Sequence, residues 1–243
     1  FTESVSLWQG QFSKSADLWR AFCTYHSEAV LAALQQTKKA ATLEKHSNDS
    51  HLVSGRKAAL VKFCGAALSL EHKGRLLNST EELGIDYLCT GIQLLDDLTD
   101  HAEDYHQWGN TFPLQEALRR IRRFEVTVRH LRDEEIIPLL ILSGAVPRVV
   151  ELASEYLMEG LLKLAVPATS ATYRYIDSLV ENSREGAGGL KQLLNDYHDE
   201  VLIMARSFCE GREAWGQLLT NTEYSHLWIS MQSQFDRIAK ASN

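Results

Sequence analysis

The chain has 243 residues, of which 44% are hydrophobic and 23% charged, a composition typical of globular domains and not of disordered or fibrous chains. Its 4 Pro and 14 Gly exclude most β-sandwiches, because such folds need a turn about every 8–12 residues. The 25 basic and 32 acidic residues give a net charge of 25 − 32 = −7, which argues against a dedicated nucleic-acid-binding protein.

Helical periodicity dominates the chain from its beginning. Apolar residues recur every three or four positions from Ser15 to Glu44, which predicts one amphipathic helix. A second, strongly apolar helix is predicted from Lys57 to His72, with Gly74 ending it. The third predicted helix runs from about Glu81 to His106.

Helices are also expected through the second half of the chain. They are predicted at about 113–131, 134–143, 147–164, 170–183, 189–210 and 222–240. The glycine-rich run from Glu185 to Gly189 is the clearest break predicted among them. Because no internal repeat or linker interrupts the pattern, we expect a single all-α domain over residues 1–243.

The chain shows no pattern of a membrane or secreted protein. No apolar run reaches the roughly 20 residues that cross a bilayer, because charges such as Arg148 and Glu151 interrupt the most apolar region, so we expect no transmembrane segment. The chain begins at Phe1 without a signal-peptide pattern, so we expect a cytoplasmic location and missing sequence upstream. Four widely spaced cysteines are predicted to be free, buried thiols of a reducing compartment: Cys23, Cys64, Cys89 and Cys209.

The third predicted helix carries most of the candidate chemistry. Ser79 and Glu82 fit a capping box at its start. Near its end, five carboxylates crowd together: Asp96, Asp97, Asp100, Glu103 and Asp104. Like charges three and four residues apart destabilise a helix, so this row favours a compensating cation. Oxygen ligands suit Mg²⁺, with Mn²⁺ as the alternative metal; a solvated acidic helix face is the alternative to any metal site.

The surrounding sequence resembles two related enzyme families. The segment from Gln93 to Asp100 reads Q-x-x-D-D-x-x-D and resembles the second aspartate-rich motif of the trans-prenyl diphosphate synthases. The segment from Asp96 to Asp104, followed by Gly109 to Pro113, is similar to the corresponding part of the squalene and phytoene synthases. Both families share the class I isoprenoid synthase fold. The resemblance therefore implies an all-α helical bundle around a central apolar cavity, and a homodimer.

The resemblance also implies a substrate and roles for individual residues. In these families an allylic prenyl diphosphate is ionised, and divalent metal ions stabilise the diphosphate that leaves. Asp96, Asp100 and Asp104 would be the main metal ligands, with Asp96 and Asp100 as the catalytic pair. Asp97 and Glu103 would be alternative ligands or would support the others. Five residues are predicted to bind the diphosphate or line the cavity, on the resemblance of short motifs: Lys57, Arg56, Gln93, Arg174 and Tyr175.

The chain departs from these families in one motif. They carry another aspartate-rich motif on an earlier helix, and no DDxxD sequence lies before Asp96 in this chain. The leading interpretation is therefore an atypical class I terpene synthase (cyclase). A chain-elongating or head-to-head prenyltransferase of the same fold and a catalytically inactive helical interaction module are the alternatives.

Three weaker candidates remain from the sequence. The basic cluster Arg119, Arg120, Arg122 and Arg123 is predicted to be solvated or to pair with acids such as Glu116, and contact with diphosphate is the minor alternative. The pair His198-Asp199 also occurs in helical metal phosphohydrolases, and a surface helix is the alternative there. Four aromatic residues could line a cavity, although each is more typical of an ordinary core: Tyr25, Phe63, Tyr87 and Trp228.

Overall fold

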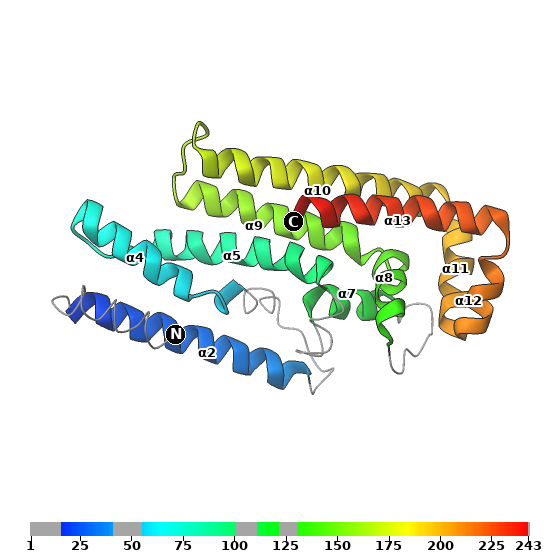
Figure 1. Cartoon of the computed structure of the whole chain (residues 1–243), viewed down its shortest axis with the longest axis horizontal. Helices are drawn as coiled ribbons and strands as arrows, with labels where there is room; N and C mark the ends of the chain where they lie inside the picture. The colour runs from blue at the N-terminus through cyan, green and yellow to red at the C-terminus, as the bar shows by residue number, and fades with distance from the viewer. Residues whose placement is uncertain (1–15, 41–54, 101–110, 122–130, 243) are drawn as a thin grey trace. The chain divides into compact units, whose positions relative to one another are not determined.

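The computed structural model of the chain describes residues 16–40, 55–100, 111–121 and 131–242. These residues form ten α-helices and no strand, which confirms the predicted all-α class (Figure 1). The chain divides into two compact units. Unit 1 comprises residues 1–90 and 156–167, and unit 2 comprises 91–155 and 168–243. The single domain expected from the sequence, and the class I isoprenoid synthase fold itself, stay predictions.

Unit 1 is built around the helices α2 (Ala16–Ala40) and α4 (Leu60–Lys73), which pack along each other (Figure 1). The start of α5 (Ser79–Thr99) and the end of α9 (Ala145–Lys163) complete the unit. Gly74 ends α4 as predicted, because its φ of 67° is a left-handed conformation that glycine adopts without strain. The buried hydrophobic cluster of this unit comprises Ala21, Tyr25, Ala59 and Ala66.

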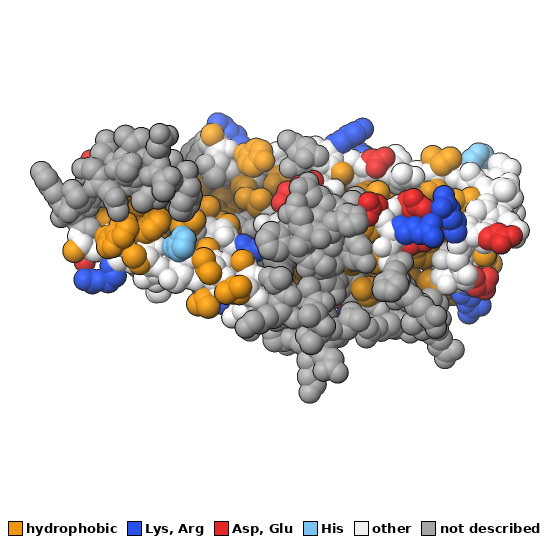
Figure 2. Space-filling model, turned by 60° about the horizontal axis from the view of Figure 1, so that its bottom comes forward, with side chains coloured by type: hydrophobic (Ala, Val, Ile, Leu, Met, Phe, Trp, Pro, Cys, Tyr) orange, Lys and Arg blue, Asp and Glu red, His pale blue; other side chains and the backbone are white. Residues whose placement is uncertain are grey.

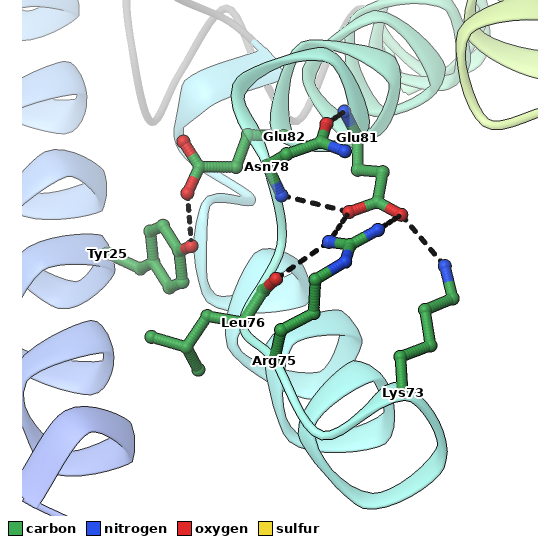
Figure 3. Close-up of polar contacts among 7 residues, drawn as sticks. All are labelled: Tyr25, Lys73, Arg75, Leu76, Asn78, Glu81 and Glu82. Atoms are coloured by element: carbon green, nitrogen blue, oxygen red, sulfur yellow. Dashed lines mark hydrogen bonds and ion pairs between the residues drawn. The ribbon is translucent and has the colours of Figure 1, made fainter.

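The start of α5 is fixed by a capping box one residue earlier than predicted (Figure 3). The backbone N–H of Glu81 donates to Asn78 Oδ1 at 2.9 Å, and the backbone N–H of Asn78 donates to Glu81 Oε2 at 2.9 Å. The prediction that Ser79 and Glu82 form this box is therefore wrong. Glu82 instead accepts a hydrogen bond of 2.6 Å from the hydroxyl of Tyr25 on α2, which ties α5 to that helix.

Glu81 also joins α5 to the end of α4. Its carboxylate lies 2.7 Å from Arg75 Nη1 and 2.8 Å from Lys73 Nζ (Figure 3). The hydrogen bonds from Arg75 and then from Lys73 hold the pKa of Glu81 well below its usual range. The carboxylate is consequently ionised and bound from two sides at neutral pH.

Unit 2 contains the remaining helices and most of the fully buried apolar side chains. Its complete helices are α7 (Phe112–Ile121), α8 (Asp133–Leu142), α10 (Ala171–Asp196), α11 (His198–Glu210), α12 (Arg212–Leu218) and α13 (Thr222–Ser242). The helix α8 lies at the centre, in contact with α7, α11 and α13. Four of its side chains are completely buried: Ile136, Leu139, Leu140 and Ile141.

The helix α10 continues through the glycine-rich run where a break was predicted, so that prediction is wrong. The glycines instead allow α13 to lie close beside α10 (Figure 1). A Cβ atom on Gly186 would lie 2.8 Å from Ile238 Cγ1 and 2.9 Å from the backbone oxygen of Gln234, and one on Gly189 would lie 2.5 Å from Gln234 Oε1. Because these glycines have no side chain, the two helices can pack closely, and the chain does not turn at this point.

A helix that crosses a membrane must be both long enough and apolar enough to span the bilayer. Within the described residues, no single helix is long and apolar enough to cross a bilayer. The helices α8 and α9 pass the test only when they are taken together, and they meet at a bend of 78°.

The four cysteines are free, as predicted, but they are not uniformly buried. Cys23 and Cys64 are exposed, so the expectation of burial is wrong for them. Cys89 and Cys209 are half-buried, and burial raises the pKa of each thiol to about 11.

Candidate functional site

The last turns of α5 bring four of the predicted site residues together. This α5 polar cluster consists of Gln93, Asp96, Asp97 and Asp100. The side-chain amide of Gln93 donates to Asp97 Oδ1 at 2.8 Å and to Asp96 Oδ2 at 3.2 Å. The backbone N–H of Asp100 donates to the backbone oxygen of Asp96 at 2.9 Å, which places Asp100 one helical turn after Asp96.

The members of the α5 polar cluster differ in their exposure. The side chains of Asp96 and Asp100 are exposed, whereas Asp97 is completely buried at 0% relative exposure. Gln93 lies between these extremes and contacts both the exposed Asp96 and the buried Asp97. The cluster therefore has an exposed pair of carboxylates and a buried carboxylate held by the same amide.

The position of the cluster on α5 is electrostatically unfavourable. The carbonyl end of a helix carries a partial negative charge, and carboxylates there are destabilising. The last turn of α5 contains no basic residue. The amide of Gln93 compensates part of the negative charge, and a bound cation would compensate more.

The donor atoms of the cluster suit a hard divalent cation only with help from other ligands. Among the described residues, no group of three or more His, Cys, Asp or Glu side chains is arranged to hold a metal ion. Mg²⁺ is, however, commonly held by one or two carboxylates together with water and phosphate oxygens. The pair Asp96 and Asp100 meets that smaller requirement by chemistry, while Glu103 and Asp104 lie outside the described residues.

The residues predicted to bind diphosphate lie on other elements. Arg56 and Lys57 belong to unit 1 and precede α4, and Arg56 Nε lies 3.7 Å from Glu28 Oε1. Arg174 and Tyr175 lie in the first turn of α10 in unit 2, and both are exposed. Their contact with a diphosphate stays a prediction.

Each unit contains a cavity that is partly lined by charged side chains. The cavity in unit 1 has a volume of about 580 Å³ and is lined by residues of α2 together with Arg56. The cavity in unit 2 has a volume of about 700 Å³ and lies against α9, α10 and α11. Residues of the α5 polar cluster line neither of them, so the central apolar cavity implied by the resemblance stays a prediction.

A buried ion-pair group in unit 1 was not anticipated from the sequence. Lys62 is only 3% exposed, and its Nζ lies 2.7 Å from Glu28 Oε2 and 2.9 Å from Asp86 Oδ1. The group joins α2, α4 and α5, and burial raises the pKa of Asp86 despite the contact with Lys62. The sequence contained one signal for it, a single lysine within the apolar core segment of α4.

Most of the weaker candidates from the sequence make ordinary structural contacts where they are described, and Arg120 and His198 also line the cavity of unit 2. Arg119 and Arg120 both bind Glu116, at 2.7 Å and 2.6 Å, which confirms the predicted pairing. Arg122 and Arg123 lie outside the described residues. The four aromatic side chains that were candidates for a cavity lining each contact another aromatic ring or a lysine: Tyr25, Phe63, Tyr87 and Trp228.

We compared the chain with protein-family models, with curated proteins and with solved structures, and none matches it. The chemistry of the α5 polar cluster and the resemblance of the short segment around it are the features that point to a function.

Proposed function

We propose that the protein is a Mg²⁺-dependent class I terpene synthase (cyclase), which ionises an allylic prenyl diphosphate and directs the carbocation to a terpene product. The observation that supports it is the α5 polar cluster. The exposed Asp96 and Asp100 lie one helical turn apart, and the Gln93 amide binds both Asp96 and the buried Asp97.

The electrostatics of this cluster favour a cation. Its carboxylates repel one another and also oppose the partial charge at the end of the helix. A cation bound between these carboxylates would offset both effects. A divalent ion bound there stabilises negative charge on a departing diphosphate.

Each residue of the site then has a defined task. Asp96 and Asp100 would hold the metal ion, with Glu103 and Asp104 as further ligands. Gln93 would orient the oxygens of Asp96 and Asp97, and Asp97 would support that arrangement from the interior. Lys57, Arg56, Arg174 and Tyr175 would donate hydrogen bonds to the diphosphate.

A helical interaction module is the second candidate, and a different observation favours it. Several large apolar side chains are exposed on the helices of unit 1, among them Trp19, Leu31 and Leu34 on α2 and Val61 and Leu68 on α4. Figure 2 shows hydrophobic side chains gathered on part of one face of the molecule. Exposed apolar surface of this kind is typical of protein contacts.

The two candidates predict different results in an activity assay. The purified protein is incubated with allylic diphosphates of several chain lengths and Mg²⁺, while hydrocarbon products and released diphosphate are measured. We expect product from at least one chain length, and we expect chelation of the metal to abolish it. Longer prenyl diphosphates as the product would indicate the prenyltransferase alternative, and no turnover of any substrate would support the interaction module.

The double variant Asp96→Asn with Asp100→Asn tests the assignment of the metal site. We expect it to lower turnover by about 100-fold or more, because a metal ion contributes several kcal/mol of charge stabilisation. It should also weaken Mg²⁺ binding measured by calorimetry in the absence of substrate. The matched control is Asp177→Asn with Asp236→Asn, which removes two exposed carboxylates elsewhere in unit 2. Equal turnover in the two double variants would refute the assignment.

A further inference from the structure

The cavity of unit 2 described above, called the basic groove from here on, is lined by an excess of basic side chains, although the net charge of the protein is negative. It has a volume of about 700 Å³, which lies within the range of small-molecule sites of about 300–1,000 Å³. Five basic side chains from four helices line it: Arg120, Arg148, Arg184, Lys191 and His198. Glu151 and Glu155 also line it, so that the four Arg and Lys exceed the carboxylates by 4 − 2 = 2.

One wall of the groove is a face of α10. Arg184, Gly188 and Lys191 are four and three residues apart, so they lie along one side of this helix. A Cβ atom on Gly188 would meet no other atom within 4 Å, which leaves open space between the two basic side chains. Seven residues of helix separate the two cations by about 10 Å along its axis.

These two cations are available to a ligand. Arg184 and Lys191 are both exposed, and neither makes a hydrogen bond or ion pair with another residue in the described part of the chain. Their positive charges also act on Glu151, another residue that lines the groove. The pKa of Glu151 is lowered by its hydrogen bond with Arg148 and further by the charges of Lys191 and Arg184.

The other two cations of the groove already have acidic partners. Arg148 Nη1 lies 2.7 Å from Glu151 Oε2, and Arg120 Nε lies 2.6 Å from Glu116 Oε1. Arg120 Nη1 lies 3.7 Å from the position that a Cβ on Gly144 would take, so its guanidinium reaches the turn between α8 and α9. Each guanidinium retains further N–H donors beyond the one that binds its carboxylate.

We propose that this groove binds a small molecule that carries two or more linked phosphate groups. Guanidinium and ammonium groups are the preferred partners of phosphate oxygens. The spacing of Arg184 and Lys191 matches a ligand longer than a single phosphate, and the volume leaves room for an organic group. Of the residues predicted to hold the metal ion, the three that the structure describes, Asp96, Asp97 and Asp100, do not line the groove, so the proposal does not rest on the proposed catalytic site.

The test measures binding of inorganic diphosphate to the intact protein by calorimetry, without divalent ions. We expect diphosphate to bind at least tenfold more tightly than orthophosphate, and the affinity to fall with added salt. A nucleoside triphosphate and a prenyl diphosphate are titrated in parallel, and the tighter of the two identifies the organic group. If diphosphate does not bind, or binds no better than orthophosphate, the proposal is overturned.

Two variants locate the binding to the groove. We expect Arg184→Gln with Lys191→Gln to weaken diphosphate binding by at least tenfold. The control, Arg206→Gln with Lys240→Gln, removes the same charge from exposed positions outside the groove and should bind like the wild type. Gly188→Gln keeps every charge but fills the open space, and should also weaken binding.

The binding test of the groove and the activity test of the proposed enzyme can fail independently of each other. The variant Asp96→Asn with Asp100→Asn should bind diphosphate normally in the absence of metal ions. Equal losses in the groove variant and in the Arg206 and Lys240 control would show that binding follows net charge alone, which would overturn the site. Circular dichroism of each variant confirms that it is folded.

Discussion

The two charged side chains that are buried among the described residues, Lys62 and Asp97, each have a hydrogen-bonded polar partner. Lys62 is the clearest case in unit 1, since its ammonium group lies between Glu28 and Asp86. Burial alone would lower the pKa of Lys62, but the hydrogen bonds to Glu28 and Asp86 outweigh it and leave that pKa raised. The lysine is therefore protonated at neutral pH and connects three helices.

Removing this lysine should destabilise the protein strongly. The variant Lys62→Met keeps most of the side-chain volume but removes the counter-ion of Asp86 and leaves Glu28 with Arg56 alone. We expect the free energy of unfolding, measured by urea denaturation, to fall by about 3 kcal/mol, as for other broken buried ion pairs. The control Lys73→Met removes a lysine that is 54% exposed and should cost less than about 1 kcal/mol.

The pH dependence gives a second readout for Lys62. A raised pKa means that the folded state holds the proton more tightly than the unfolded state. The stabilisation is thus complete below pH 10.5, the ordinary pKa of lysine, and is lost as the pH rises through the raised pKa. The difference between wild type and Lys62→Met should accordingly shrink in strongly alkaline solution. Equal stability of the two proteins at neutral pH would contradict the role assigned to the ion-pair group.

At the scale of a helix, the ends of the elements follow from a few side chains. Gly74 ends α4 through its left-handed conformation, and the hydroxyl of Ser170 accepts a 3.1 Å hydrogen bond from the backbone N–H of Tyr173 at the start of α10. The sequence predicted a capping box of Ser79 with Glu82 at the start of α5, whereas the structure forms the box one residue earlier, between Asn78 and Glu81. Contacts from outside the helix select the box of Asn78 and Glu81.

The choice of cap can be measured with two neighbouring substitutions. Asn78→Ala removes the side chain that accepts the hydrogen bond from Glu81, and should lower the free energy of unfolding by about 1 kcal/mol. Ser79→Ala lies inside the first turn and should change it by less than about 0.5 kcal/mol. A larger loss in Ser79→Ala than in Asn78→Ala, in urea denaturation of both variants, would show that the helix begins at the other box.

At the scale of the whole molecule, the chain is organised as two compact units, and close helix packing shapes each of them. In unit 2 the closest approach involves α10 and α13, which are far apart in sequence. In unit 1, Gly84 and Gly160 play a similar part, because a Cβ on Gly160 would lie 2.9 Å from the backbone oxygen of Gly84. Four glycines inside the described helices thus mark close helix contacts: Gly84, Gly160, Gly186 and Gly189.

Two glycines two residues apart on α10 should respond oppositely to alanine. In Gly186→Ala the new Cβ meets Ile238 and the backbone of Gln234, and we expect a loss of about 1–2 kcal/mol in the free energy of unfolding. In Gly188→Ala the Cβ meets open space, so the higher helix propensity of alanine should add about 0.5–1 kcal/mol. Thermal and urea denaturation of both variants give the sign, and a gain in Gly186→Ala would contradict the packing described.

The sequence by itself determined the all-α class and most helix positions, because hydrophobic periodicity and local capping residues act over a few neighbouring positions. It also singled out the residues of the α5 polar cluster, since four residues on successive turns of one helix must lie together. The pairing of Arg119 and Arg120 with Glu116 was predictable for the same reason.

Only the tertiary structure decided the features that join distant segments. The glycines of α10 were predicted to break the chain, but they lie against α13. The sequence predicted no role for Lys62, which the structure places beside Glu28 and Asp86. The basic groove likewise combines side chains from four helices. Local patterns cannot specify such contacts, because they depend on which helix faces meet when the apolar surfaces are buried.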